Sequence, residues 1–229
     1  MTGSVTYCGP PPLPAEIWTS WNLDPPLLAG LAGLAFLIGR DRRGALAVLA
    51  LVIAFVSPLC ALSAALFSAR VVHHVLLVAV AAPLLALMVP TRRGGGVAAP
   101  LVAMTGTLWL WHVPALYDLA LSETPAYWAM QASLLVTAIL FWRAVLSPGQ
   151  PAHAALLGVL AGFIQMGMLG ALLTFAPAPL YAAHALSPLE WGLSPLTDQQ
   201  LGGLIMWVPS CLLFALWGTS AARRAWQAA

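Results

Sequence analysis

Seven long apolar segments constrain what this chain can fold into more than any other feature of its sequence. These segments are longer than the strands and buried helices of soluble domains, and their lengths approach the roughly 20 residues that a helix needs to cross a bilayer. The composition agrees, because 61% of the residues are hydrophobic and only 7% are charged. We predict an all-α, polytopic membrane bundle of about seven transmembrane helices. The predicted spans are 25–39, 44–66, 71–90, 97–117, 126–146, 152–175 and 201–221.

The arginines predict the orientation of these spans, because cationic loops are retained on the cytoplasmic side of a membrane. Arg70 falls on one side of the predicted spans, and the other eight arginines fall on the opposite side. The eight are Arg40, Arg42, Arg43, Arg92, Arg93, Arg143, Arg223 and Arg224. We therefore expect an extracytoplasmic tail over 1–24, a seven-helix domain over 25–221 and a cytoplasmic tail over 222–229. The net charge of +2 gives no basis for a nucleic-acid partner.

This topology places three histidines in the outer third of the bilayer, where ionisable groups are costly and often functional. His73 and His74 lie in the third predicted span, and His112 lies in the fourth, before Asp118. Neutral imidazole suits copper, so the histidines are candidate metal ligands. A packing role is equally open, in which the rings bond carbonyls that prolines leave free. Because adjacent helix residues point about 100° apart, His73 and His74 share one site only if the helix is distorted.

Methionines and glycines within the spans also have two interpretations. Met166 and Met168 lie in the outer half of the sixth predicted span and could support a soft metal, although methionine more often fills gaps in a core. Glycines recur along the same span and predict close helix packing in preference to a pore. They are Gly158, Gly162, Gly167 and Gly170, and Gly30 and Gly33 form a similar pair in the first span.

The cysteines form an odd set, Cys8, Cys60 and Cys211, without the spacing of a metal motif. We expect no disulfide framework, and the one pair to consider is Cys8 with Cys60, both near the outer surface. No serine, histidine and carboxylate arrangement can be read from the spacing, so we expect no enzyme. The middle and inner parts of the predicted spans carry no charge, which disfavours a pump.

Three stretches resemble one known family. They are 67–77 (FSARVVHHVLL), 108–118 (LWLWHVPALYD) and 198–209 (DQQLGGLIMWVP). The chain is similar over about 24–217 to the CtaG family, the seven-span assembly factor of caa-type cytochrome c oxidase. The resemblance implies a role in maturing a haem-copper oxidase, at a copper-handling step, in the bacterial plasma (inner) membrane. It also implies oxidase subunits and copper chaperones as partners, within the lipid bilayer.

The resemblance maps the family's histidines onto His74 and His112, and its aspartate at the head of the last span onto Asp198. Typical members carry further histidines where this chain has Arg70, Tyr127 and Gln131, which implies a remodelled site. His73 could compensate in part.

We therefore predict that His74 and His112 face each other and form the centre of the site. The predicted metal ligands are His74, His112 and His73, with Asp118, Asp198, Arg70, Met166 and Met168 in supporting positions. Two other functions stay open: a small-solute or copper transporter, and an accessory subunit that binds the oxidase without metal.

Overall fold

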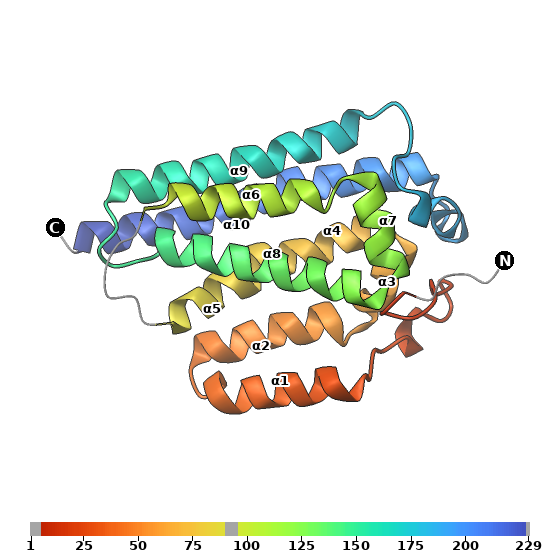
Figure 1. The fold of residues 1–229 in the computed structure, drawn as a ribbon, viewed down its shortest axis with the longest axis horizontal. Helices are drawn as coiled ribbons and strands as arrows, with labels where there is room; N and C mark the ends of the chain where they lie inside the picture. Colours follow the sequence, from red (N-terminus) through yellow and green to blue (C-terminus); the bar gives the residue numbers. More distant parts are fainter. Residues whose placement is uncertain (1–5, 90–95, 228–229) are drawn as a thin grey trace.

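The computed structural model describes residues 6–89 and 96–227, and these fold into antiparallel helices that lie side by side (Figure 1). A π-helical segment, η2 (Leu76–Ala81), joins α4 to α5, and the connecting segments contain the 3-10 turns η1 (Ile17–Thr19), η3 (Ala182–His184) and η4 (Ser187–Trp191). The other elements are α1 Pro25–Ile38, α2 Arg42–Phe55, α3 Pro58–Ala65, α4 Phe67–Val75, α5 Ala82–Met88, α6 Ala98–Leu110, α7 Pro114–Ser122, α8 Thr124–Val145, α9 Ala152–Phe175 and α10 Pro195–Gln227. The predicted all-α class is confirmed.

Four helical segments in these ranges are long and apolar enough to cross a membrane. They are Phe67–Met88, Thr124–Val145, Ala152–Phe175 and Pro195–Arg223. The pair α2 and α3 makes a fifth if it is counted as one span bent by 45°. The apolar helices α1 and α6 are shorter, at 14 and 13 residues. The chain is therefore a membrane protein with a helix in each predicted segment, while seven crossings stay a prediction.

The arginines that the structure describes lie mainly at one end of the bundle. Arg40, Arg42 and Arg43 lie at the turn between α1 and α2, at the same end as the last turn of α8 with Arg143 (Figure 1). Arg92, Arg93 and the side chain of Arg224 lie outside what the structure describes. Arg70 does not belong to an outer loop, because its side chain is fully buried on α4. The orientation relative to the membrane stays a prediction.

Prolines divide two of the predicted spans into two helices each. Pro58 begins α3, and the Ser57 hydroxyl caps this new helix by accepting the Leu59 N–H at 3.2 Å. In the predicted span 97–117, α6 ends at Leu110 and Pro114 begins α7, which turns sharply away from the α6 axis (Figure 1). Proline lacks the N–H that would continue the preceding helix, so each helix restarts there in a new direction.

Pro83 explains the π-helical segment that follows the adjacent histidines. In this segment the Ala82 N–H bonds to the Leu77 carbonyl, five residues back. Pro83 has no N–H to offer to the Val78 or Ala79 carbonyl. The Trp142 indole N–H donates to Val78 at 2.7 Å, and the Trp217 indole N–H donates to Ala79 at 2.9 Å. Two tryptophans from α8 and α10 thus satisfy the carbonyls next to the proline, as backbone groups in a membrane require.

Glycines bring α9 and α10 into close contact. A Cβ at Gly170 would lie 2.8 Å from the Gly203 carbonyl oxygen, and one at Gly203 would overlap the side chain of Thr174. On the other side of α10, a Cβ at Gly202 would lie 2.5 Å from the Phe67 ring of α4. The predicted packing seam is confirmed for this span. Gly30 and Gly33 differ, because nothing lies within 4 Å of an added Cβ at either position.

A disulfide bond joins Cys8 to Cys60 and fixes the N-terminal segment to α3. This is the one pair that the sequence left open, although we expected no disulfide framework. Both cysteines lie at the same end of the bundle although they are 52 positions apart in the sequence. The Tyr7 hydroxyl also donates to the Asp24 carboxylate at 2.7 Å, and the Trp191 indole donates to the Pro12 carbonyl at 3.2 Å. The segment predicted as a tail is instead, from Thr6 onward, part of the folded domain.

Candidate functional site: a buried histidine and arginine cluster

His74 and His112 meet where α4 faces the junction between α6 and α7. Their ring centroids lie 6.2 Å apart, and both side chains are buried. His73 is also buried, with its ring centroid 5.7 Å from that of His74. The structure thus brings together the two histidines that we expected to face each other.

The break after α6 fixes the orientation of the His112 ring. Its Nδ1 lies 2.7 Å from the Leu108 carbonyl oxygen. Because a carbonyl can only accept, Nδ1 carries the hydrogen and Nε2 keeps a free lone pair. This Nε2 is buried and has no hydrogen-bond partner in the described part of the chain. One ring nitrogen therefore has the packing role that we considered, and the other is available to a ligand.

His73 and His74 diverge on α4. The His73 ring packs edge-on against Phe55 of α2, with centroids 4.9 Å apart, whereas His74 contacts His112. None of their four ring nitrogens has a hydrogen-bond partner among residues 6–89 and 96–227. In the same ranges, no three His, Cys, Asp or Glu side chains are close enough together to hold a metal ion. The structure therefore offers a pair of imidazoles, not the three-histidine ligand set that we predicted.

Arg70 lies beside these histidines, one turn earlier on α4. Its guanidinium lies over the Tyr127 ring of α8, with the central carbon 5.4 Å from the ring centroid. Gln131, one turn further along α8, is also buried, and neither of its amide atoms has a partner among the described residues. Arg70, Tyr127 and Gln131 are the positions at which the sequence departs from the resembled pattern. The departures thus form one continuous patch beside His73 and His74.

The two aspartates expected near the histidines bind backbone groups instead. The Asp198 carboxylate accepts the N–H groups of Phe67 at 2.6 Å and Ser68 at 3.1 Å, and also the Ser68 hydroxyl at 2.5 Å. It therefore caps the N-terminus of α4, for which Leu66 provides no side-chain cap. Asp118 accepts the N–H groups of Ala182 and Ala183 and fixes η3. Both aspartates position the elements around the site and do not orient an imidazole.

The predicted methionines divide between the interior and the surface. Met166 is buried on α9 and lines a small cavity with Leu108 and Met104. Met168 is 52% exposed on the outer face of α9, with its sulfur 4.0 Å from the Gln165 amide nitrogen. Met168 is therefore not part of the cluster.

His184 is a buried residue of this end of the bundle that we did not predict. The Tyr117 hydroxyl lies 2.8 Å from its Nε2, and its Nδ1 lies 3.3 Å from the Ala65 carbonyl. Burial, with the charge of Arg70, lowers the pKa of His184 to about 3. No local pattern indicates this role, because Tyr117 precedes His184 by 67 residues.

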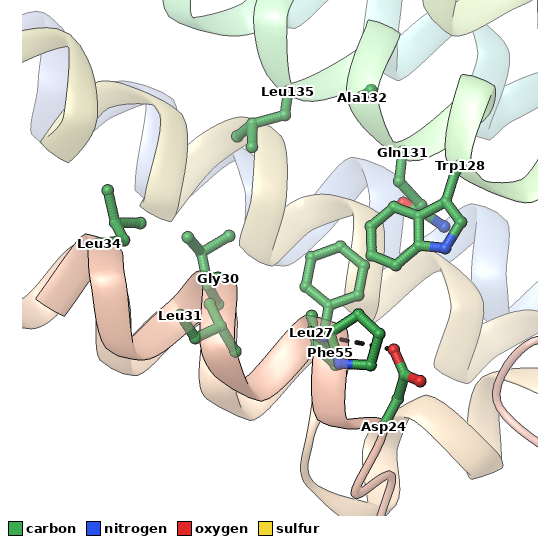
Figure 2. Close-up of a pocket in the computed structure, with 12 residues that line it drawn as sticks. Asp24, Leu27, Gly30, Leu31, Leu34, Phe55, Trp128, Gln131, Ala132 and Leu135 are labelled. Carbon is green, nitrogen blue, oxygen red and sulfur yellow. Dashed lines mark hydrogen bonds between the residues drawn. The ribbon is translucent and has the colours of Figure 1, made fainter.

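An apolar groove of about 470 Å³ runs beside the cluster between α1, α2 and α8. Figure 2 shows Leu34 and Leu135 at one end and Asp24, Trp128 and Gln131 at the other. Phe55 lines the groove and contacts His73, so the groove and the cluster share a wall.

The model of the cytochrome c oxidase caa3 assembly factor, Caa3_CtaG, matches residues 95–228, more than half of the chain. The chain belongs to the CtaG family. No curated protein and no solved structure matches it.

The CtaG match covers one part of the cluster and leaves out another. His112, Asp118, Asp198 and Gln131 lie inside the matched range, whereas α4, with Arg70 and its two histidines, precedes it. The CtaG family is named for the assembly of an oxidase and not for a reaction, and that the chain is not an enzyme stays a prediction.

Proposed function

We propose that this CtaG-family chain assists the maturation of a haem-copper oxidase by holding copper transiently at the outer side of the bacterial plasma membrane. The observation that carries the proposal is the pair of buried imidazoles, His74 and His112, on two separate elements. Oxidase subunits would receive the metal, and a copper chaperone would supply it.

The donor set of this pair fits copper better than zinc. With metal–nitrogen bonds of about 2 Å, two imidazoles on opposite sides of one ion would have ring centroids about 6 Å apart, and those at a tetrahedral angle about 5 Å apart. The separation of 6.2 Å between His74 and His112 agrees with the first value. Imidazole is a suitable ligand for copper, whereas structural zinc takes four protein ligands. His74 and His112 would hold the metal, and the bond from His112 Nδ1 to Leu108 keeps Nε2 free for it.

Copper retention by the purified protein tests the metal step. We expect detergent-purified wild type to keep copper after loading with Cu(I) and desalting, and His74→Ala and His112→Ala to lose it. The control is His153→Ala, because His153 is exposed in the first turn of α9, at the opposite end of the bundle. Equal copper content in the wild type and in both site variants would overturn the copper step.

Oxidase maturation in cells tests the assembly role separately. Deleting the gene should reduce the haem absorbance and the activity of the oxidase in membranes, and a plasmid copy should restore both. A normal oxidase in the deletion strain would contradict the assembly role whatever the purified protein binds.

An accessory subunit that binds the oxidase without metal is the second candidate. It is favoured by the lack of a third His, Cys, Asp or Glu ligand near the pair in the described part of the chain. Co-purification of the oxidase with a copper-free wild-type protein, and with His74→Ala to the same extent, would select this role. The transporter gains no support from the glycine series, because Gly170 and Gly203 close a helix seam.

A further inference from the structure

Arg70 carries a buried charge that no carboxylate among the described residues neutralises. Its side chain has 0% exposure, and its three guanidinium nitrogens have no hydrogen-bond partner among the described residues. The Tyr127 ring beneath it gives a cation–π contact, and the Tyr127 hydroxyl interacts with Arg70 and with Gln131. Tyr127 is neutral, however, so it does not balance the charge. A buried ion without a partner is strongly destabilising, so the site requires an acceptor.

The carboxylates at this end of the bundle are engaged elsewhere. Asp198 accepts from α4, Asp118 accepts from η3, and Asp24 accepts from the Tyr7 hydroxyl and the Leu27 N–H. The acids Glu16, Glu123 and Glu190 are exposed at the surface. Protein carboxylates therefore do not supply the counter-charge of Arg70.

The groups around the guanidinium are hydrogen-bond donors that also lack partners. Arg70 and Gln131 both interact with Tyr127, and Arg70 interacts electrostatically with the His73 ring. The Gln131 amide and the His73 ring nitrogens are buried and have no partner within the described ranges. A guanidinium, an amide and an imidazole that can each donate an N–H thus interact with Arg70 or with the Tyr127 side chain beneath it, and such a group of donors is the chemistry of an anion site.

We propose that Arg70, with Gln131 and His73, binds one small monovalent anion, for which chloride is the probe. One guanidinium carries one positive charge, so one such anion balances it. The anion is small because Arg70, His73 and Gln131 are almost fully enclosed. Gln131 also lines the open groove of Figure 2, so one residue of the site borders this groove. The site needs no metal and goes beyond the proposed copper step.

The test compares chloride with gluconate, an anion too large for the enclosed site, on chelator-treated protein in detergent at constant ionic strength. We expect chloride to raise the melting temperature of the wild type and to broaden its ³⁵Cl NMR line. Arg70→Met should abolish both effects, yet melt no lower than the wild type in gluconate, because an apolar side chain removes the buried charge. Gln131→Leu should weaken chloride binding about tenfold, since one hydrogen bond to a charged group is lost.

The control is Arg42→Gln, which removes an exposed arginine at the other end of the bundle and should keep the full chloride response. Arg70→Gln replaces Arg70→Met if the latter is not inserted into the membrane. A wild type that does not respond to chloride, or a response that is equal in the wild type and the Arg70 variant, would overturn the proposal. Neither outcome depends on copper retention, so this test and that of the copper step fail independently.

Discussion

At the scale of single residues, two glycines in similar apolar helices have opposite surroundings. Gly203 on α10 lies against the backbone oxygen of Gly170, whereas Gly30 on α1 has open space on the side where a Cβ would be. We expect Gly203→Ala to destabilise the protein by about 1–3 kcal/mol, because a backbone oxygen cannot move aside as a flexible side chain can. Gly30→Ala should be neutral or stabilising by up to about 1 kcal/mol, because alanine favours helix. Unfolding in mixed detergent micelles measures both, and an equal loss in the two variants would contradict the close approach.

The buried His184 should make stability depend on pH. Its folded pKa of about 3 is below the value of about 6.5 for an unfolded histidine, so the unfolded chain binds a proton that the folded chain excludes. The stability that the neutral His184 contributes is therefore fully present above about pH 6.5 and is lost as the pH falls toward 3. We expect the melting temperature of the wild type to fall between pH 7 and pH 4. The melting temperature of His184→Gln should fall less steeply, because its unfolding takes up to one proton fewer per molecule. Parallel profiles would show that His184 does not exclude this proton.

At the scale of elements, α4 depends on a carboxylate supplied by α10. Asp198 satisfies the N–H groups of Phe67 and Ser68 in a buried position, so Asp198→Ala leaves these donors without a partner. We expect a loss of about 1–3 kcal/mol and faster hydrogen exchange in the first turn of α4. Asp41→Ala is the matched control, because Asp41 caps α2 in an exposed position where water can replace it. Equal exchange in α4 of the wild type and Asp198→Ala would exclude the capping role.

The helices could be predicted from the sequence, but the contacts between them could not. Apolar runs and prolines act locally, so the segments near 126–146 and 152–175 coincide with α8 and α9 within two residues. The cap of α4 instead joins residues 131 positions apart, and Trp217 reaches the carbonyl of Ala79 across 138 positions. No local pattern encodes such pairs. The meeting of His74 and His112 was predicted from an antiparallel arrangement of consecutive spans, which places both histidines at the same end of the bundle. The surroundings of Arg70 were not predictable in this way, because they depend on where the side chains of α8 lie.

At the scale of the whole molecule, the disulfide should contribute to stability because it closes a loop across 52 positions. We expect Cys8→Ser or Cys60→Ser to lower stability by about 2–4 kcal/mol. Treatment of the wild type with a reductant should reproduce the loss. Cys211→Ser is the control, because Cys211 is exposed and free. Unfolding curves with and without dithiothreitol measure the effect, and wild type that is insensitive to the reductant would contradict it.

The same bond has a consequence for the order in which the protein is made. Cys60 is the later of the two cysteines in the sequence, so both sulfurs exist before any residue of α4 has been translated. The covalent link can form once α2 and α3 have entered the membrane, before α4 delivers Arg70 and its histidines. The later helices then pack against an N-terminal part that the Cys8–Cys60 disulfide has already cross-linked. Biogenesis of this protein is thus tied to the oxidising machinery of the compartment that receives Cys8, at a stage when the pair of His74 and His112 does not yet exist.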